Sequence, residues 1–129
     1  MNRRIVTMLV VLVLGEIGVF YMENRDVVAM NESADALVLD ARFPDVAQSV
    51  LARERVSRRV LERVADVAQR RHDVALQVVA LERIVSSAPG DTEARLRLAQ
   101  ALRDAGRFVE AERIYRQELQ GLDYEGDEQ

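Results

Sequence analysis

The sequence predicts an all-α protein, in which an N-terminal transmembrane helix is followed by a small array of antiparallel helical hairpins. Three observations predict this fold class. Residues 5–22 form an apolar run close to the length of a membrane span. From residue 45 onward, apolar residues recur every three or four positions, as on one face of an α-helix. Pro89, Gly90 and Gly106 interrupt that pattern, and we expect each interruption to separate two helices.

The same features divide the chain of 129 residues into four parts. Residues 1–22 are predicted to form a membrane anchor, residues 23–44 a junction, residues 45–120 the helical domain and residues 121–129 an acidic tail. Cysteine is absent, which excludes disulfides, thiolate zinc sites and a cysteine nucleophile.

The N-terminal segment allows two interpretations. Arg3 and Arg4 precede the apolar run, and Glu16 lies inside it, where a charge costs about 2.5–3.5 kcal/mol on insertion scales. A cleaved signal peptide would be processed after Ala29, beyond a charged stretch that is unusual before such a site. We therefore favour an uncleaved anchor over a cleaved signal.

Arginine asymmetry predicts the orientation of this anchor. Arg3 and Arg4 precede it, whereas residues 23–48 carry six acidic residues against two arginines. Because positive residues stay on the cytoplasmic side, we expect the body to lie outside the cytoplasm, which in a bacterium means an inner-membrane protein with a periplasmic domain. Inside the segment, Gly15, Glu16 and Gly18 are candidate contacts to another membrane helix, because small residues permit close approach and intramembrane charges face protein or water.

The helices of the body follow from local signals. Ser33 is a candidate cap of a short helix over 34–40, and Pro44 begins the next element. The apolar spacing predicts one amphipathic helix over 45–69, and its basic face lies within residues 53–71, which hold seven arginines. We interpret that face as solvated and locally paired; if it has a further use, the acidic segment 23–48 or a partner is the expected target.

Two more helices are expected after this one. Asp73 caps a largely buried helix over 74–86, which Pro89 and Gly90 end, and Asp91 caps the helix over 92–105. A last helix is expected over 107–119, after a left-handed turn at Gly106.

Residues 96–119, LRLAQALRDAGRFVEAERIYRQEL, resemble a tetratricopeptide repeat. The positions that carry the resemblance are Leu98, Ala99, Leu102, Gly106, Phe108, Ala111 and Tyr115. The resemblance implies that Ala99 and Ala111 meet at a close helix crossing, with the larger side chains filling the space on either side. At two positions the sequence departs from the family pattern. Arg95 stands where the pattern has Trp, and Asp123 stands where it has the closing Pro. A degenerate repeat precedes it at about 58–90, closed by Pro89.

The resemblance also implies a function. Repeats of this family bind peptides or partner domains in a groove lined by their first helices. Carried onto this sequence, the groove positions are Glu93, Leu96, Gln100, Arg103 and Asp104. This mixed set suits a polar peptide.

Composition and the absence of catalytic motifs exclude further classes of function. The net charge of −4 argues against nucleic-acid binding. The single histidine, His72, lies in a predicted turn, and no phosphate loop or nucleophile elbow is present. We expect no enzymatic activity, no metal and no cofactor. The expected function is a membrane-tethered scaffold or assembly factor of a bacterial envelope, which binds a protein partner. The alternative is a small accessory subunit of a large membrane complex.

Overall fold

In a computed structural model of the chain, the structure describes residues 3, 4, 6, 7, 10, 14–16, 25–30 and 33–126. These residues contain α-helices and no strand, which confirms the all-α class. The helices are α2 (Arg25–Ala29), α3 (Ala34–Leu39), α4 (Phe43–Leu51), α5 (Arg58–Arg70), α6 (Val74–Ser87), α7 (Thr92–Asp104) and α8 (Phe108–Gly126).

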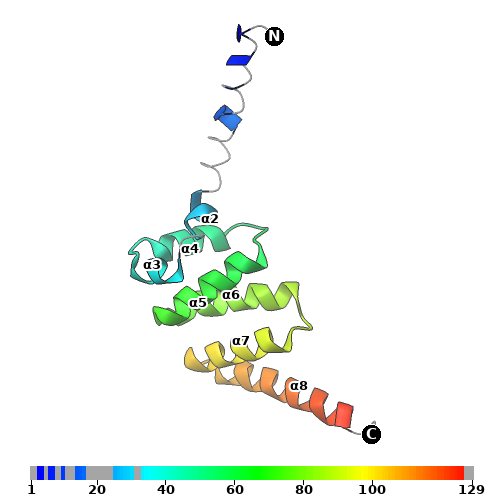
Figure 1. The fold of residues 1–129 in the computed structure, drawn as a ribbon. Helices are drawn as coiled ribbons and strands as arrows, with labels where there is room; N and C mark the ends of the chain where they lie inside the picture. The colour runs from blue at the N-terminus through cyan, green and yellow to red at the C-terminus, as the bar shows by residue number, and fades with distance from the viewer. Residues whose placement is uncertain are drawn as a thin grey trace.

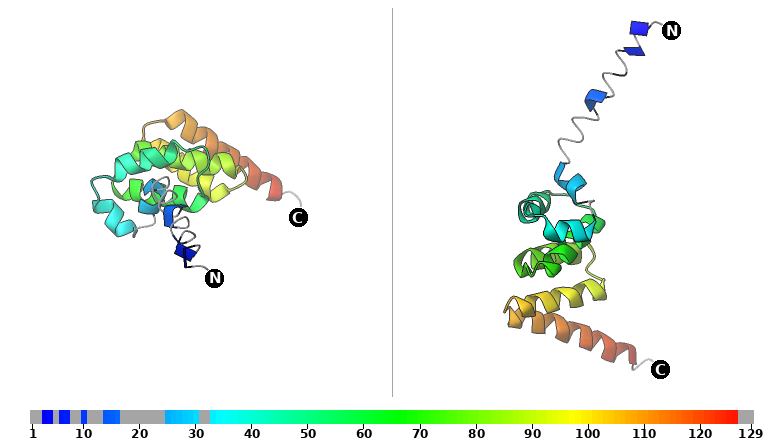
Figure 2. Two further views of the ribbon diagram at one scale, coloured as in Figure 1. Left: turned by 90° about the horizontal axis from the view of Figure 1, so that it is seen from above. Right: turned by 60° about the vertical axis from the view of Figure 1, so that its left-hand side comes forward.

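The helices stack as successive hairpins (Figure 1). The pairs α5–α6 and α7–α8 are antiparallel hairpins, and α6 packs against α7 to join them. On the other side, α3 packs against α5, α4 packs against α6, and α2 lies against α4 (Figure 2). The α2–α4 layer therefore covers one end of the stack.

Three of the helix starts follow the capping signals of the sequence. The side chains of Ser33, Asp73 and Asp91 each accept a hydrogen bond from a backbone N–H three residues on, which satisfies a donor that the helix leaves free. The turn before α8 places Gly106 at φ +77°, the left-handed region that glycine enters without strain. These parts of the prediction are confirmed.

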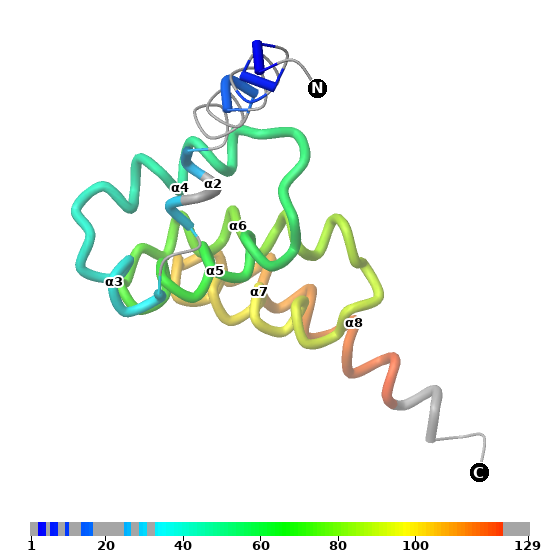
Figure 3. Tube along the Cα trace, turned by 45° about the horizontal axis from the view of Figure 1, so that its top comes forward, coloured from blue at the N-terminus to red at the C-terminus, as the bar shows by residue number. Residues whose placement is uncertain are grey.

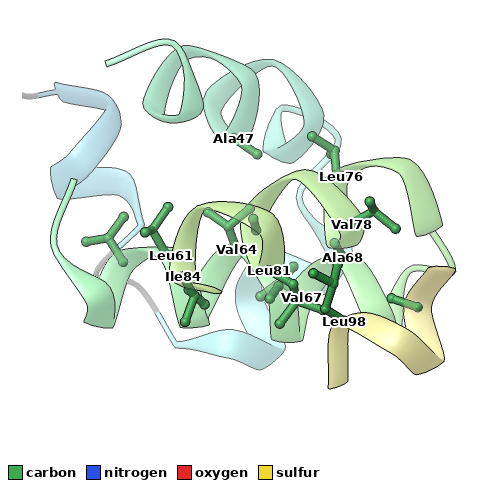
Figure 4. Packing of buried hydrophobic residues seen from close by; sticks show 14 of the residues in the cluster. Ala47, Leu61, Val64, Val67, Ala68, Leu76, Val78, Leu81, Ile84 and Leu98 are labelled. Atoms are coloured by element: carbon green, nitrogen blue, oxygen red, sulfur yellow. The ribbon is translucent and has the colours of Figure 1, made fainter. Parts of the chain in front are cut away.

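The core consists of aliphatic side chains, as the scarcity of aromatic residues requires. Val64, Val67 and Leu81 are fully enclosed between α5 and α6, and Leu98 brings α7 into the same cluster (Figure 4). Phe43 at the start of α4 is the largest fully buried side chain in the described residues. Burial of each such side chain stabilises the fold by about 1.5–3 kcal/mol relative to leaving it exposed.

The single helix predicted over 45–69 is wrong. The structure divides it into α4 and α5, with residues 52–57 between them. Arg83 of α6 donates to the carbonyl oxygens of Leu51 at 2.7 Å and Glu54 at 3.0 Å, and Ser57 caps the restart. The periodicity continues across the break because both helices bury an apolar face against α6, so spacing alone hides the interruption.

The C-terminal boundary of the last helix, α8, also differs from the sequence prediction. The sequence predicts a helix ending at 119 and a frayed tail from 121, whereas α8 continues to Gly126. Leu119 and Leu122 continue the helical spacing of Tyr115, and the acidic residues beyond them do not prevent helix formation.

Most of the predicted anchor, residues 5–22, lies outside the described residues, as does Gly18. Gly15 and Glu16 are described and are exposed. Among the residues that the structure describes, no helix is both long and apolar enough to cross a membrane. The anchor and the contact at Gly15, Glu16 and Gly18 stay predictions.

Two aspartates make the fold sensitive to acid. A hydrogen bond from the Ala94 N–H and a second from Arg58 hold the pKa of Asp91 below its ordinary value. Hydrogen bonds from Arg42 lower the pKa of Asp40 to about 2. A depressed folded pKa means that the carboxylate's stabilisation is complete above its unfolded pKa, about 3.9, and is lost as the pH falls toward the folded value.

We therefore expect the melting temperature, followed by far-ultraviolet circular dichroism, to fall between about pH 4 and pH 2. Asp91→Asn keeps the cap but removes the charge, so part of this acid dependence should disappear. Asp91→Ala should also lower the melting temperature at neutral pH, because it removes the cap of α7. Equal acid dependence in wild type and Asp91→Asn would show that the Asp91 pair does not contribute.

Candidate protein-binding surface

Helix α7 has one face that builds the core and one that does not. Ala94, Leu98, Ala99 and Leu102 are buried against the neighbouring helices. This burial follows the three- and four-residue spacing of these side chains. The residues on the opposite face of α7 do not contribute to the core and are exposed to solvent.

All five predicted groove residues lie on exposed positions of α7. They are Glu93, Leu96, Gln100, Arg103 and Asp104. Leu96 is the apolar member and is 38% exposed. The set therefore presents one leucine among polar and charged groups.

The charges of α7 fall into two groups. Arg95 and Arg97 form ion pairs with Glu118 of α8 and Asp66 of α5, each at 2.7 Å, and these pairs tie α7 to both neighbours. By contrast, Glu93, Arg103 and Asp104 form no ion pair within residues 33–126. The first group serves the fold, and the second group is available to another molecule.

Residues 66–117, which run from within α5 into α8, match the family model described as tetratricopeptide repeat. This match supports the assignment of this part of the chain to the tetratricopeptide repeat family. Its members are protein-interaction modules, so a protein partner is expected for this chain. Comparisons with the curated proteins and with the solved structures gave no match.

The repeat positions are mostly where the resemblance places them. Ala99 and Ala111 are buried, and so are Leu98 and Leu102 beside them, while Tyr115 is half-buried against the core. Phe108 departs from the expectation, because 65% of its side chain is exposed. It lies in the first turn of the last described helix, on a side that no described element covers.

Several arginines of residues 53–71 have partners distant in the sequence, which local pairing did not reveal. Arg53 pairs with Asp26, and Arg70 pairs with Asp35 at 2.6 Å, so the acidic segment 23–48 is a target of the basic face. Arg71 donates to the carbonyl oxygens of Val38 at 2.9 Å and Asp40 at 2.7 Å. These bonds satisfy the C-terminal end of α3.

One site was missed by sequence reasoning. A pocket of about 660 Å³ lies between the first half of α7 and the second half of α8. Leu96, Tyr115, Leu119 and Leu122 supply its apolar lining, and the Arg95–Glu118 pair its polar part. The spacing of Tyr115, Leu119 and Leu122 is a helical stripe, which was the available signal, but assigning residues from 121 to a tail concealed it.

Proposed function

We propose that this protein is a membrane-tethered interaction module of a bacterial envelope, which holds a partner protein on the exposed face of α7. The tetratricopeptide repeat over residues 66–117 supports the binding role. The apolar run over 5–22 and the arginines before it support the tether and the periplasmic placement of the body.

The observation that carries the binding proposal is the contrast between paired and unpaired charges on α7. Arg95 and Arg97 are committed to ion pairs within the fold, whereas Glu93, Arg103 and Asp104 are not. Charged side chains that stabilise nothing within the described chain are suited to recognising a polar segment through charge-assisted hydrogen bonds. Leu96 adds an apolar contact beside them.

Reversing one of these charges should weaken binding and leave the fold intact. Arg103→Glu alters an exposed residue, so the melting temperature should change little. Capture of the partner by crosslinking from native membranes should fall, since one charge-assisted hydrogen bond contributes about 1.5–3 kcal/mol.

The matched control is Arg59→Glu, an exposed arginine on α5. Capture should survive this change. If only Arg59→Glu abolishes capture, the basic face of α5 is the working surface and the α7 proposal is wrong. If neither change matters, the binding contact lies outside the described helical body, and the membrane segment around Glu16 becomes the surface to test.

The tether has its own test. A reporter that is active only outside the cytoplasm, fused after Gln129, should be active in cells, because arginine asymmetry places the body on that side. The intact mass of the native protein should correspond to the uncleaved chain. Activity from a cytoplasmic reporter alone would overturn the predicted orientation. An intact mass equal to that of residues 30–129 would show that the N-terminal segment is a cleaved signal peptide and not an anchor.

The alternative, an accessory subunit of a membrane complex, draws on Glu16 and the glycines beside it. A charge within an apolar segment favours a partner helix at that depth. Detergent extraction separates the two functions. A subunit should remain in stoichiometric association with its complex, whereas an adaptor should dissociate.

A further inference from the structure

The short helix α2 is held on the body by contacts with distant parts of the chain. Its five residues are too few to form a stable helix alone, because isolated helices shorter than about 12–15 residues are marginal in water. It lies beside α4 at the N-terminal end of the stack (Figure 3). The first attachment is Met30, directly after α2, which is 1% exposed and belongs to the hydrophobic core.

The second attachment is the carboxylate of Asp26, whose side chain is only 13% exposed. Its Oδ2 accepts hydrogen bonds from Ser49 Oγ at 3.0 Å and from Arg53 Nε at 2.9 Å. Arg53 Nη2 donates to Oδ1, so the guanidinium and the carboxylate form a bidentate pair. Because a bidentate pair fixes the relative direction of its two groups, this contact constrains how α2 is oriented on the body.

Arg53 projects from a segment whose backbone is itself held in place. It lies in the connection 52–57 between α4 and α5. Arg83 of α6 donates to the carbonyl oxygens of Leu51 and Glu54, which lie on either side of Arg53 in the sequence. A continuous series of polar contacts therefore runs from α6, through this connection, to α2.

The predicted anchor ends close to these attachments. The apolar run closes at residue 22 and α2 begins at Arg25. The three Cα–Cα steps between them reach at most about 11 Å, which leaves no length of chain for a long linker. Cleavage after Ala29 would also remove Asp26, so the fold uses a residue that a cleaved signal peptide would discard.

We propose that α2 is a clasp, through which Met30 and the Asp26–Arg53 pair fix the N-terminal segment to the body in one direction. This inference rests on the tether of the proposed function. A body held in this way presents the α7 face at a constant orientation to the membrane, whereas a body on a flexible linker would sample many orientations. Breaking the pair should free the N-terminal segment and leave α5–α8 folded, because those helices share their own buried core.

The test measures distances between pairs of spin labels on the full chain in lipid nanodiscs, by double electron–electron resonance. The chain has no cysteine, so labels attach only where cysteines are introduced. Ser86→Cys labels an exposed position of α6, and it is paired with Arg25→Cys on α2 or with Leu14→Cys in the predicted anchor. Each pair should give one narrow distance distribution.

Loss of the ion pair should widen both distributions. Arg53→Gln should at least double their widths, and so should Asp26→Asn. The two changes combined should add nothing further, since both remove the same contact. A third pair, Gln48→Cys on α4 with Ser86→Cys, should stay narrow throughout and so show that the body remains folded.

The matched control is Arg55→Gln. Arg55 is an exposed arginine of the same connection, and it forms no ion pair within the described residues, so its replacement should leave every width unchanged. Equal widths with and without Arg53→Gln would overturn the clasp. A narrow distribution from Arg25→Cys together with a broad one from Leu14→Cys would overturn the fixed direction, because the chain would then bend before α2.

Failure of the proposed function is detected by separate measurements. Loss of the tether is read from the intact mass, and loss of the binding face from capture by Arg103→Glu. Broad distributions in a chain of uncleaved mass would therefore contradict the clasp alone.

Discussion

Leu81→Ala should lower the free energy of unfolding by about 2–5 kcal/mol, the range for truncating a buried leucine. Leu81 lies on α6 with 0% of its surface exposed, inside the cluster that α5, α6 and α7 share. The substitution removes apolar contacts and leaves a cavity that close-packed neighbours fill only in part. Urea unfolding followed by circular dichroism measures the effect.

The control is Leu39→Ala on α3. Its side chain is 86% exposed, so the same chemical change should alter stability by no more than about 0.5 kcal/mol. Similar losses at both positions would contradict the burial of Leu81, and with it the packing of α6 at the centre of the stack.

Ala111→Leu should destabilise the chain by about 1–3 kcal/mol through overpacking. Ala111 on α8 is 3% exposed and belongs to the buried hydrophobic cluster, and α8 packs against α7. A leucine introduces additional carbon atoms into an interface that already excludes solvent, so either the helices separate or the side chain adopts a strained rotamer.

Glu112→Leu is the matched control for this substitution. The neighbouring Glu112 side chain is 61% exposed and pairs only with Arg116 on the same helix, at 2.6 Å. Replacing it should change stability by about 0.5 kcal/mol or less, since an exposed ion pair contributes little. Equal melting temperatures for the two variants would contradict the close crossing of α7 and α8.

The sequence by itself determined three of the helix starts and the repeat. Three caps accept hydrogen bonds from backbone N–H groups three residues further along the chain, namely Ser33, Asp73 and Asp91. Their capping role therefore depends only on the neighbouring sequence. Gly106 and the repeat spacing likewise predicted the turn and the hairpin, which the family match over residues 66–117 supports. The five exposed residues of α7 followed from the same local register.

Only the tertiary structure decided where the long amphipathic pattern breaks, how the arginines pair and which apolar face stays open. Arg83 reaches the end of α4 from 32 residues away, and Arg71 reaches the end of α3 from a similar separation. Phe108 is exposed and its neighbour Ala111 is buried because only one side of α8 meets another helix. Local spacing specifies a face of a helix, but what covers that face depends on contacts between segments distant in the sequence.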